Sequence, residues 1–229
     1  MRVAFALYAF AVSRSDPARC FFFYLASFVC DELDGRFARM FNQTSTLGAV
    51  LDMVTDRVAT SCLLAVLCTH YPTLQPVLLA LLMLDIFSHW FQMYGTLIMG
   101  SSTHKDVNSR SFIVRFYYKH RLFMGFCCIC VEVLYLLLYL LAFPQFHALA
   151  PLSFPRLVVS FMEQSLGVGF LPGGKVPLVC VLCVLALPGF VIKQAINVVQ
   201  LRTAAEQLVA YDISATGRKK GTTSKGRRS

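Results

Sequence analysis

Four aspartates stand at spacings that could build a metal site between two helices. Asp31 and Asp34 lie at i and i+3 near the end of one apolar segment, and Asp52 and Asp56 lie at i and i+4 near the start of the next. Both spacings place the paired side chains on one face of a helix. Gly48 lies one turn before Asp52 on the same stripe, and without a Cβ it lets another helix or a ligand approach closely. The spacing therefore predicts two acidic helix faces that converge when the two helices pack antiparallel.

Acidic side chains at membrane depth are costly, so they need a compensating charge. Four carboxylates on converging faces would repel one another unless cations lay between them, and ligation by oxygen alone suits Mg²⁺ or Mn²⁺. A pair of such ions can hold a diphosphate and activate a hydroxyl for in-line attack. The alternative is a set of structural ion pairs with the basic side chains of Arg36, Arg39 and Arg57. Because that alternative does not explain why the acids share stripes with glycine, we favour a metal site.

The elements that must position these acids are apolar. Of the 229 residues, 57% are hydrophobic and 14% are charged, whereas a soluble domain has about 25% charged residues. One short and five full apolar segments follow one another along the chain, at residues 3–12, 20–37, 46–70, 73–99, 122–143 and 176–201. A spanning helix needs roughly 20 mostly apolar residues, so the first segment is too short to span. We expect an all-α integral membrane protein, a bundle of six helices made by one short and five full apolar segments.

Basic residues alternate between the two sides of this expected bundle. The loop around Arg36 and Arg39, the loop of residues 101–121 and the C-terminal end are rich in Lys and Arg, whereas the loops between them carry few. By the positive-inside rule these three regions face the cytosol. We divide the chain into a membrane domain of residues 1–201 and a basic, disordered tail of residues 202–229, because the end of the tail is too polar to pack a core. On a membrane protein such a tail indicates a cytosolic anchor or a contact with anionic lipid, and no nucleic-acid partner.

The four acids belong to a longer pattern. Residues 31–56 read D-x-x-D-G-x-x-A-R, then eight residues, then G-x-x-x-D-x-x-x-D, which resembles in full the signature of the CDP-alcohol phosphotransferases. The resemblance implies a six-helix membrane fold, usually dimeric, with a polar cavity open to the cytosol. It implies that Asp31, Asp34, Asp52 and Asp56 bind two metal ions, and that Asp56 also takes the proton from the acceptor alcohol. The residues implied to receive the CDP-linked lipid are Gly35, Ala38, Arg39 and Gly48.

Further segments are similar to the phosphatidylinositol synthases of that family. These are residues 51–57 (LDMVTDR), 84–90 (LDIFSHW), 102–105 (STHK), 115–118 (RFYY) and 132–140 (EVLYLLLYL). The resemblance implies transfer of the phosphatidyl group of CDP-diacylglycerol to myo-inositol, with release of CMP, in the endoplasmic-reticulum membrane. Such enzymes usually have a full first helix preceded by a P-N-x-x-x-x-x-R stretch, and Arg2 stands where that arginine falls. The resemblance therefore implies a six-transmembrane-helix bundle whose first helix is truncated on its N-terminal side.

An acceptor pocket is expected beside the metals, in the basic loop of residues 101–121. A neutral polyol needs many donors and acceptors in fixed positions, and the candidates are His104, Lys105, Arg115 and Tyr118. If the acceptor were glycerol phosphate or an inositol phosphate, the basic groups would bind its phosphate instead, and serine is a further alternative. The structural interpretation of the same charges is that they set the membrane topology beside lipid headgroups.

Two interpretations from other functional classes are a transporter and an inactive membrane scaffold. The intact set of acids argues against an inactive scaffold. A transporter would be expected to show Gly- or Pro-broken helices in paired halves of the chain, and no such pair is visible in the sequence.

Polar residues elsewhere in the apolar segments have both a structural and a functional interpretation. Asp85 and His89, at i and i+4, predict either a buried hydrogen bond or the wall of a polar cavity, and Lys193 and Asn197 form a similar pair on the last segment. Glu132 is expected to pair with a neighbouring helix.

Overall fold

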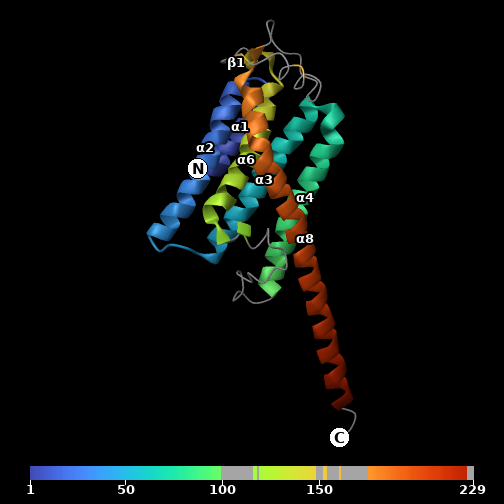
Figure 1. Ribbon diagram of the computed structural model, residues 1–229. Helices are drawn as coiled ribbons and strands as arrows, with labels where there is room; N and C mark the ends of the chain where they lie inside the picture. The colour runs from blue at the N-terminus through green and yellow to red at the C-terminus, as the bar shows by residue number, and fades with distance from the viewer. Residues whose placement is uncertain (99–115, 118, 148–151, 154–159, 161–174, 226–229) are drawn as a thin grey trace. The chain divides into compact units, whose positions relative to one another are not determined.

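The computed structural model describes residues 1–98, 116–117, 119–147, 152–153, 160 and 175–225, and these are almost all helical (Figure 1). The long helices are α1 (Arg2–Val12), α2 (Pro17–Met40), α3 (Thr46–His70), α4 (Gln75–Ile98), α6 (Arg121–Leu141) and α8 (Leu178–Lys225). Two 3₁₀ turns, η1 (Pro72–Leu74) and η2 (Pro144–Phe146), lie between helices. One short antiparallel pair joins β1 (Leu152–Ser153) to β2 (Lys175–Val176), with Leu152 opposite Val176. The prediction of an all-α chain is confirmed for the described residues.

The bounds of the helices can be compared with those of the predicted apolar segments. α3 has the predicted bounds, Thr46–His70. α2 extends past residues 20–37 at both ends. Its start lies at Pro17 because Asp16 caps the helix by accepting the backbone N–H of Arg19 at 3.0 Å, and Pro17 fits the first helical position. α8 continues to Lys225, into the segment for which the sequence predicts disorder. The division of the chain at residue 201 stays a prediction.

The turn between α2 and α3 is held by local hydrogen bonds at both helix ends. Asn42 adopts a left-handed backbone conformation with φ of 54°, and Gln43 N–H reaches back to the carbonyl of Ala38 at 2.8 Å. This is a Schellman-type ending, in which a left-handed residue redirects the chain after the last turn. Ser45 then caps α3, because its Oγ accepts the backbone N–H of Gly48 at 3.0 Å. The end of α2 is therefore followed within a few residues by a well-defined start of α3.

The described chain divides into two compact units, each with its own apolar cluster. The first unit holds Met1–Leu82 and Cys128–Phe190, and the second holds Met83–Cys127 and Val191–Ser229. In the first unit, α1, α2, α3 and α6 pack around a buried core that includes Leu63, Leu64 and Tyr139. The Tyr139 hydroxyl donates to the carbonyl of Ser13 at 2.6 Å, which satisfies a polar group in that core.

The second unit has a smaller cluster in which Tyr117, Cys127 and Ile196 are buried. Lys193 is buried there too, donates to Asn197 Oδ1 at 2.9 Å, and places its ammonium 5.8 Å from the centroid of the Tyr117 ring. These contacts support the structural interpretation of the Lys193 and Asn197 pair, because a buried cation is compensated by a hydrogen bond and an aromatic face.

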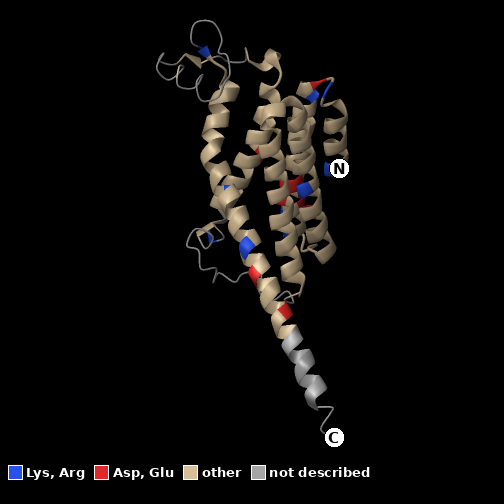
Figure 2. Ribbon diagram, turned by 90° about the vertical axis from the view of Figure 1, so that its right-hand side faces the viewer, with Lys and Arg blue, Asp and Glu red and all other residues tan. Residues whose placement is uncertain are grey.

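Three described helical segments are long and apolar enough to cross a membrane. They are Pro72–Ile98, Leu122–Leu141 and Leu178–Ala215. Figure 2 shows long stretches of helix without a charged residue. α2 and α3 have similar lengths but carry acidic and basic side chains near the turn that joins them. A helical protein with membrane-spanning segments is thus what the structure supports, and a count of six spans stays a prediction.

Candidate metal centre

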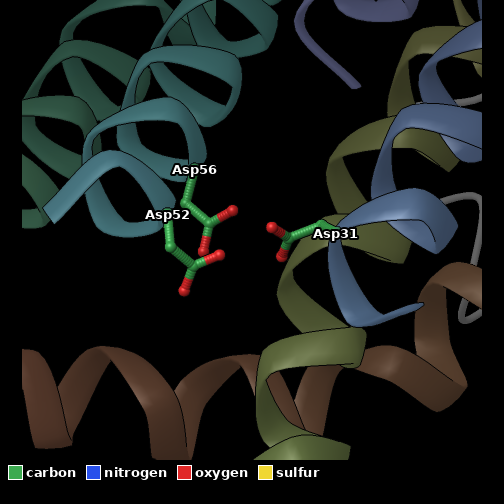
Figure 3. Close-up of side chains that lie close together, drawn as sticks. All are labelled: Asp31, Asp52 and Asp56. Atoms are coloured by element: carbon green, nitrogen blue, oxygen red, sulfur yellow. The ribbon is translucent and has the colours of Figure 1, made fainter. Parts of the chain in front are cut away.

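Three of the four predicted acids converge within the first unit. Asp31 comes from the second half of α2, and Asp52 and Asp56 come from the first half of α3. One oxygen from each of the three carboxylates lies within 4.8 Å of the others. Figure 3 shows the Asp31 carboxylate pointing across toward Asp52 and Asp56 from the opposite helix. We call Asp31, Asp52 and Asp56 the aspartate cluster. The convergence of the two acidic faces is therefore confirmed for these three residues.

The fourth predicted ligand, Asp34, is exposed and is not part of the group whose oxygens lie within 4.8 Å. It lies one turn beyond Asp31 on α2, so it shares the same side of that helix. A role for Asp34 at the metal centre stays a prediction.

The aspartate cluster surrounds a positive charge. Arg2, at the start of α1, places Nη1 at 2.9 Å from Asp52 Oδ1 and Nη2 at 2.6 Å from Asp56 Oδ1, and it also pairs with Asp31. Ser27 of α2 donates its hydroxyl to the Arg2 carbonyl at 2.8 Å and so holds this end of α1 against α2. Helical spacing could not place Arg2 in the cluster. The one sequence signal was its position in the stretch that the resemblance associates with the first helix.

The donor set fits a hard divalent cation. Three carboxylates supply only oxygen ligands, which are the ligands that Mg²⁺ and Mn²⁺ prefer. The three acids already gather around the Arg2 guanidinium, so their oxygens are directed at one cationic centre. The cluster is also partly open to solvent, since the side chains of Asp52 and Asp56 are 52% and 35% exposed. A hydrated ion and a substrate oxygen could therefore reach it.

The alternative of purely structural ion pairs accounts for only part of this arrangement. Arg36 pairs with Glu32 at 2.7 Å, one turn earlier on the same helix. Arg57 lies 3.7 Å from Asp56 Oδ2 and partly balances that acid. Arg39 is exposed in the last turn of α2. Of the three arginines considered in the alternative, Arg57 contacts the aspartate cluster. With Arg2 and Arg57 beside three carboxylates, the cluster keeps a net negative charge without a further cation.

The residues predicted to receive the CDP-linked lipid lie around the α2–α3 turn. Gly35 and Ala38 are half-buried, whereas Arg39 and Gly48 are exposed. A Cβ at Gly48 would come within 3.1 Å of Ser45 Oγ, so glycine leaves room for the cap of α3. A Cβ at Gly35 would lie 3.4 Å from the Arg39 guanidinium. Lipid binding by these four residues stays a prediction. His104, Lys105, Arg115 and Tyr118 lie outside the residues that the structure describes.

Comparisons with known proteins cover the aspartate cluster and most of the chain. The family model described as CDP-alcohol phosphatidyltransferase matches residues 1–153. A probable CDP-diacylglycerol–inositol 3-phosphatidyltransferase 2 of Arabidopsis thaliana is 47% identical over 221 residues, which are 96% of this chain and 90% of the relative. The CDP-diacylglycerol–inositol 3-phosphatidyltransferase of Schizosaccharomyces pombe is 40% identical over 86% of this chain and 80% of its own length. The Homo sapiens protein of that name is 32% identical over 96% of this chain and 92% of its own. No solved structure matches the chain.

Proposed function

The chain belongs to the CDP-alcohol phosphatidyltransferase family, and we propose that it transfers the phosphatidyl group of CDP-diacylglycerol to myo-inositol. The observation that carries the proposal is the convergence of Asp31, Asp52 and Asp56 on one cationic centre. The choice of inositol rests on relatives named CDP-diacylglycerol–inositol 3-phosphatidyltransferase that match nearly the whole chain. The products are phosphatidylinositol and CMP.

The reaction exchanges a phosphoanhydride bond for a phosphoester bond. An inositol hydroxyl attacks the phosphorus that carries diacylglycerol, the new P–O bond forms, and the bond from that phosphorus to the bridging oxygen of the diphosphate breaks. CMP leaves with the electron pair of that bond. Asp56 takes the proton of the attacking hydroxyl, because its carboxylate belongs to the cluster and remains 35% exposed, so that an acceptor can approach it.

The proposed metal centre uses the aspartate cluster together with Asp34. The all-oxygen donor set supports Mg²⁺ or Mn²⁺, and two such ions would be held by Asp31, Asp34, Asp52 and Asp56. When bound, such ions neutralise the diphosphate and favour ionisation of the acceptor hydroxyl. The aspartates then act as ligands that fix where the diphosphate and the hydroxyl meet.

Substrate recognition is proposed on both sides of that centre. Exposed Arg39 at the end of α2 can form paired hydrogen bonds with phosphate oxygens of CDP-diacylglycerol, and Gly35, Ala38 and Gly48 leave space near the α2–α3 turn. For the acceptor we propose His104, Lys105, Arg115 and Tyr118 on sequence grounds alone.

The proposed setting is a six-helix membrane domain in the endoplasmic reticulum that works as a homodimer. Its polar cavity and its C-terminal end would face the cytosol. Support comes from the three apolar helical segments and from the basic residues beside the α2–α3 turn and at the C-terminus.

Acceptor competition tests this function. The purified protein is given CDP-diacylglycerol and Mg²⁺ with radiolabelled free inositol, inositol phosphate, glycerol phosphate or serine, and both labelled lipid and CMP are measured. We expect labelled lipid from free inositol only, with one CMP per lipid, because sites that bond every hydroxyl reject poor matches strongly. Lipid product mainly from a phosphorylated acceptor or from serine would assign the chain to a different acceptor.

A further inference from the structure

A carboxylate outside the aspartate cluster joins three helices of the first unit. Glu132 of α6 accepts the hydroxyl of Tyr24 from α2 on Oε2 at 2.6 Å, and it accepts the hydroxyl of Thr60 from α3 on Oε1 at 2.5 Å. Tyr24 and Thr60 are 4% and 2% exposed. The prediction that Glu132 pairs with a neighbouring helix is confirmed, and it pairs with two helices rather than one.

The two partners of Glu132 lie on the same helix faces as the aspartate cluster. On α2, Tyr24 and Asp31 are seven residues apart, which is two helical turns. On α3, Thr60 follows Asp56 by one turn, and its hydroxyl also lies 3.1 Å from the Asp56 carbonyl. α2 and α3 therefore face each other at two levels, and Glu132 links them at one level while the aspartates meet at the other.

We propose that Glu132 is a positioning residue that sets the separation of α2 and α3 and thereby the geometry of the aspartate cluster. This rests on the metal centre of the proposed function. A carboxyl group can accept a hydroxyl on each of its two oxygens, and both of these hydrogen bonds are short, at 2.6 and 2.5 Å. Ligand geometry must hold to within about 0.5 Å for a site of this kind to work. The hydrogen bonds of Glu132 to Tyr24 and Thr60 lie one to two helical turns from the aspartates, which is close enough to control the positions of the carboxylate oxygens.

Two variants of Glu132 distinguish the effect of its hydrogen bonds from the effect of side-chain size. Glu132→Gln can keep the bridge, because its amide oxygen accepts from Tyr24 and its NH₂ donates to Thr60, whose own proton then goes to the Asp56 carbonyl. Glu132→Leu has similar size but offers no acceptor to either hydroxyl. Tyr24→Phe combined with Thr60→Val removes the two donors and leaves Glu132 in place.

The matched control is Tyr139→Phe, which removes a tyrosine hydroxyl from the core of the same unit, where it donates to Ser13. We expect both this variant and Glu132→Leu to lower thermal stability, but only Glu132→Leu to change the aspartate cluster. A purely structural role for Glu132 would make the two variants behave alike.

The experiment measures Mn²⁺ affinity of the purified protein in detergent by electron paramagnetic resonance, without substrate, together with the melting temperature in chelator. We expect Glu132→Leu to raise the Mn²⁺ dissociation constant by about tenfold or more, as loss of supporting contacts around metal ligands does. Glu132→Gln should stay within about threefold of wild type, and Tyr139→Phe should leave the constant unchanged. If Glu132→Leu does not fold, the Tyr24→Phe, Thr60→Val double variant serves in its place, with the same direction expected.

Wild-type affinity in a folded Glu132→Leu variant, or an equal loss in Tyr139→Phe, would overturn the proposal. Phosphatidylinositol formation is measured on the same samples, so the two claims fail separately. A wild-type protein that binds Mn²⁺ but makes no lipid would contradict the proposed function and leave the positioning role supported by the affinities. A wild-type protein that makes lipid, with variants whose Mn²⁺ affinity is unchanged, would support the proposed function and contradict the positioning role of Glu132.

Discussion

Asp52 and Asp56 differ in their surroundings although they stand one turn apart on α3. The Asp56 side chain is the less exposed of the two, and it has two cationic neighbours, Arg2 at 2.6 Å and Arg57 at 3.7 Å. Asp52 is more open and contacts Arg2 at 2.9 Å. The i, i+4 spacing predicts that both acids share a face, but it does not distinguish them. The structure distinguishes them by the exposure of their side chains and by the second cation, Arg57, beside Asp56.

Replacing either acid with its amide should remove activity while the chain stays folded. Asp52→Asn and Asp56→Asn keep the side-chain shape but take away a charged ligand. Loss of an outer partner of a metal site already costs 10–100-fold, so we expect lipid formation to fall by at least about 100-fold. The assay is incorporation of labelled inositol into lipid by purified protein.

The control for these substitutions is Glu206→Gln. Glu206 is an exposed acid on α8 that pairs with Arg202 at 2.9 Å, and its loss should leave the rate unchanged. Near-normal turnover in both aspartate variants would remove the aspartate cluster from the mechanism.

At the scale of elements, sequence predicted what is local and missed what is distant. The bounds of α3 and the convergence of Asp31 with Asp52 and Asp56 followed from apolar runs, a short turn and helical periodicity. The bridge through Glu132 did not, because its partners lie 108 and 72 residues away in sequence. Periodicity gives the face of a helix that is polar. It does not say which other helix that face meets, since that depends on the packing of the whole unit.

The start of α3 should depend on the Ser45 cap. Ser45→Ala removes the acceptor for Gly48 N–H, and loss of such a cap costs about 1 kcal/mol. That cost corresponds to about fivefold faster hydrogen exchange of the amides in the first turn of α3, provided that they open locally. Exchange followed by mass spectrometry on peptides covering residues 45–50 measures it.

Asp16→Ala provides the matched comparison, because Asp16 caps α2 in the same way. It should speed exchange in the first turn of α2 and leave the start of α3 unchanged. If Ser45→Ala left the first turn of α3 as protected as in wild type, the cap would not be what defines this helix end.

At the scale of the whole molecule, the difference between prediction and structure lies at the C-terminal end. The apolar segment predicted at residues 176–201 forms the first part of α8, but the helix runs on to Lys225. The apolar residues of a segment predict which part of a helix is buried. The helix can continue beyond its last apolar residue, because each further residue adds its own backbone hydrogen bond. Beyond Ala204, the described side chains of α8 include no buried residue.

Removal of residues 217–229 should therefore leave catalysis intact. The sequence of this segment is too polar to pack a core, and such terminal segments tolerate truncation, so we expect turnover within about twofold of wild type. The measurement is the rate of phosphatidylinositol formation per mole of purified protein in detergent. A large loss of rate at normal expression would show that the end of α8 takes part in the reaction or in its assembly.

The central claim is that the aspartate cluster binds divalent metal and that this metal is needed for phosphatidyl transfer to inositol. Its most direct test is a chelator titration of labelled-inositol incorporation, with Mg²⁺ or Mn²⁺ then added back, in wild type and in Asp56→Asn. We expect the wild-type rate to vanish with chelator and to return with either metal, and the variant to stay inactive throughout. A wild-type rate that resists the chelator, or an Asp56→Asn variant that regains full activity with metal, would contradict the account.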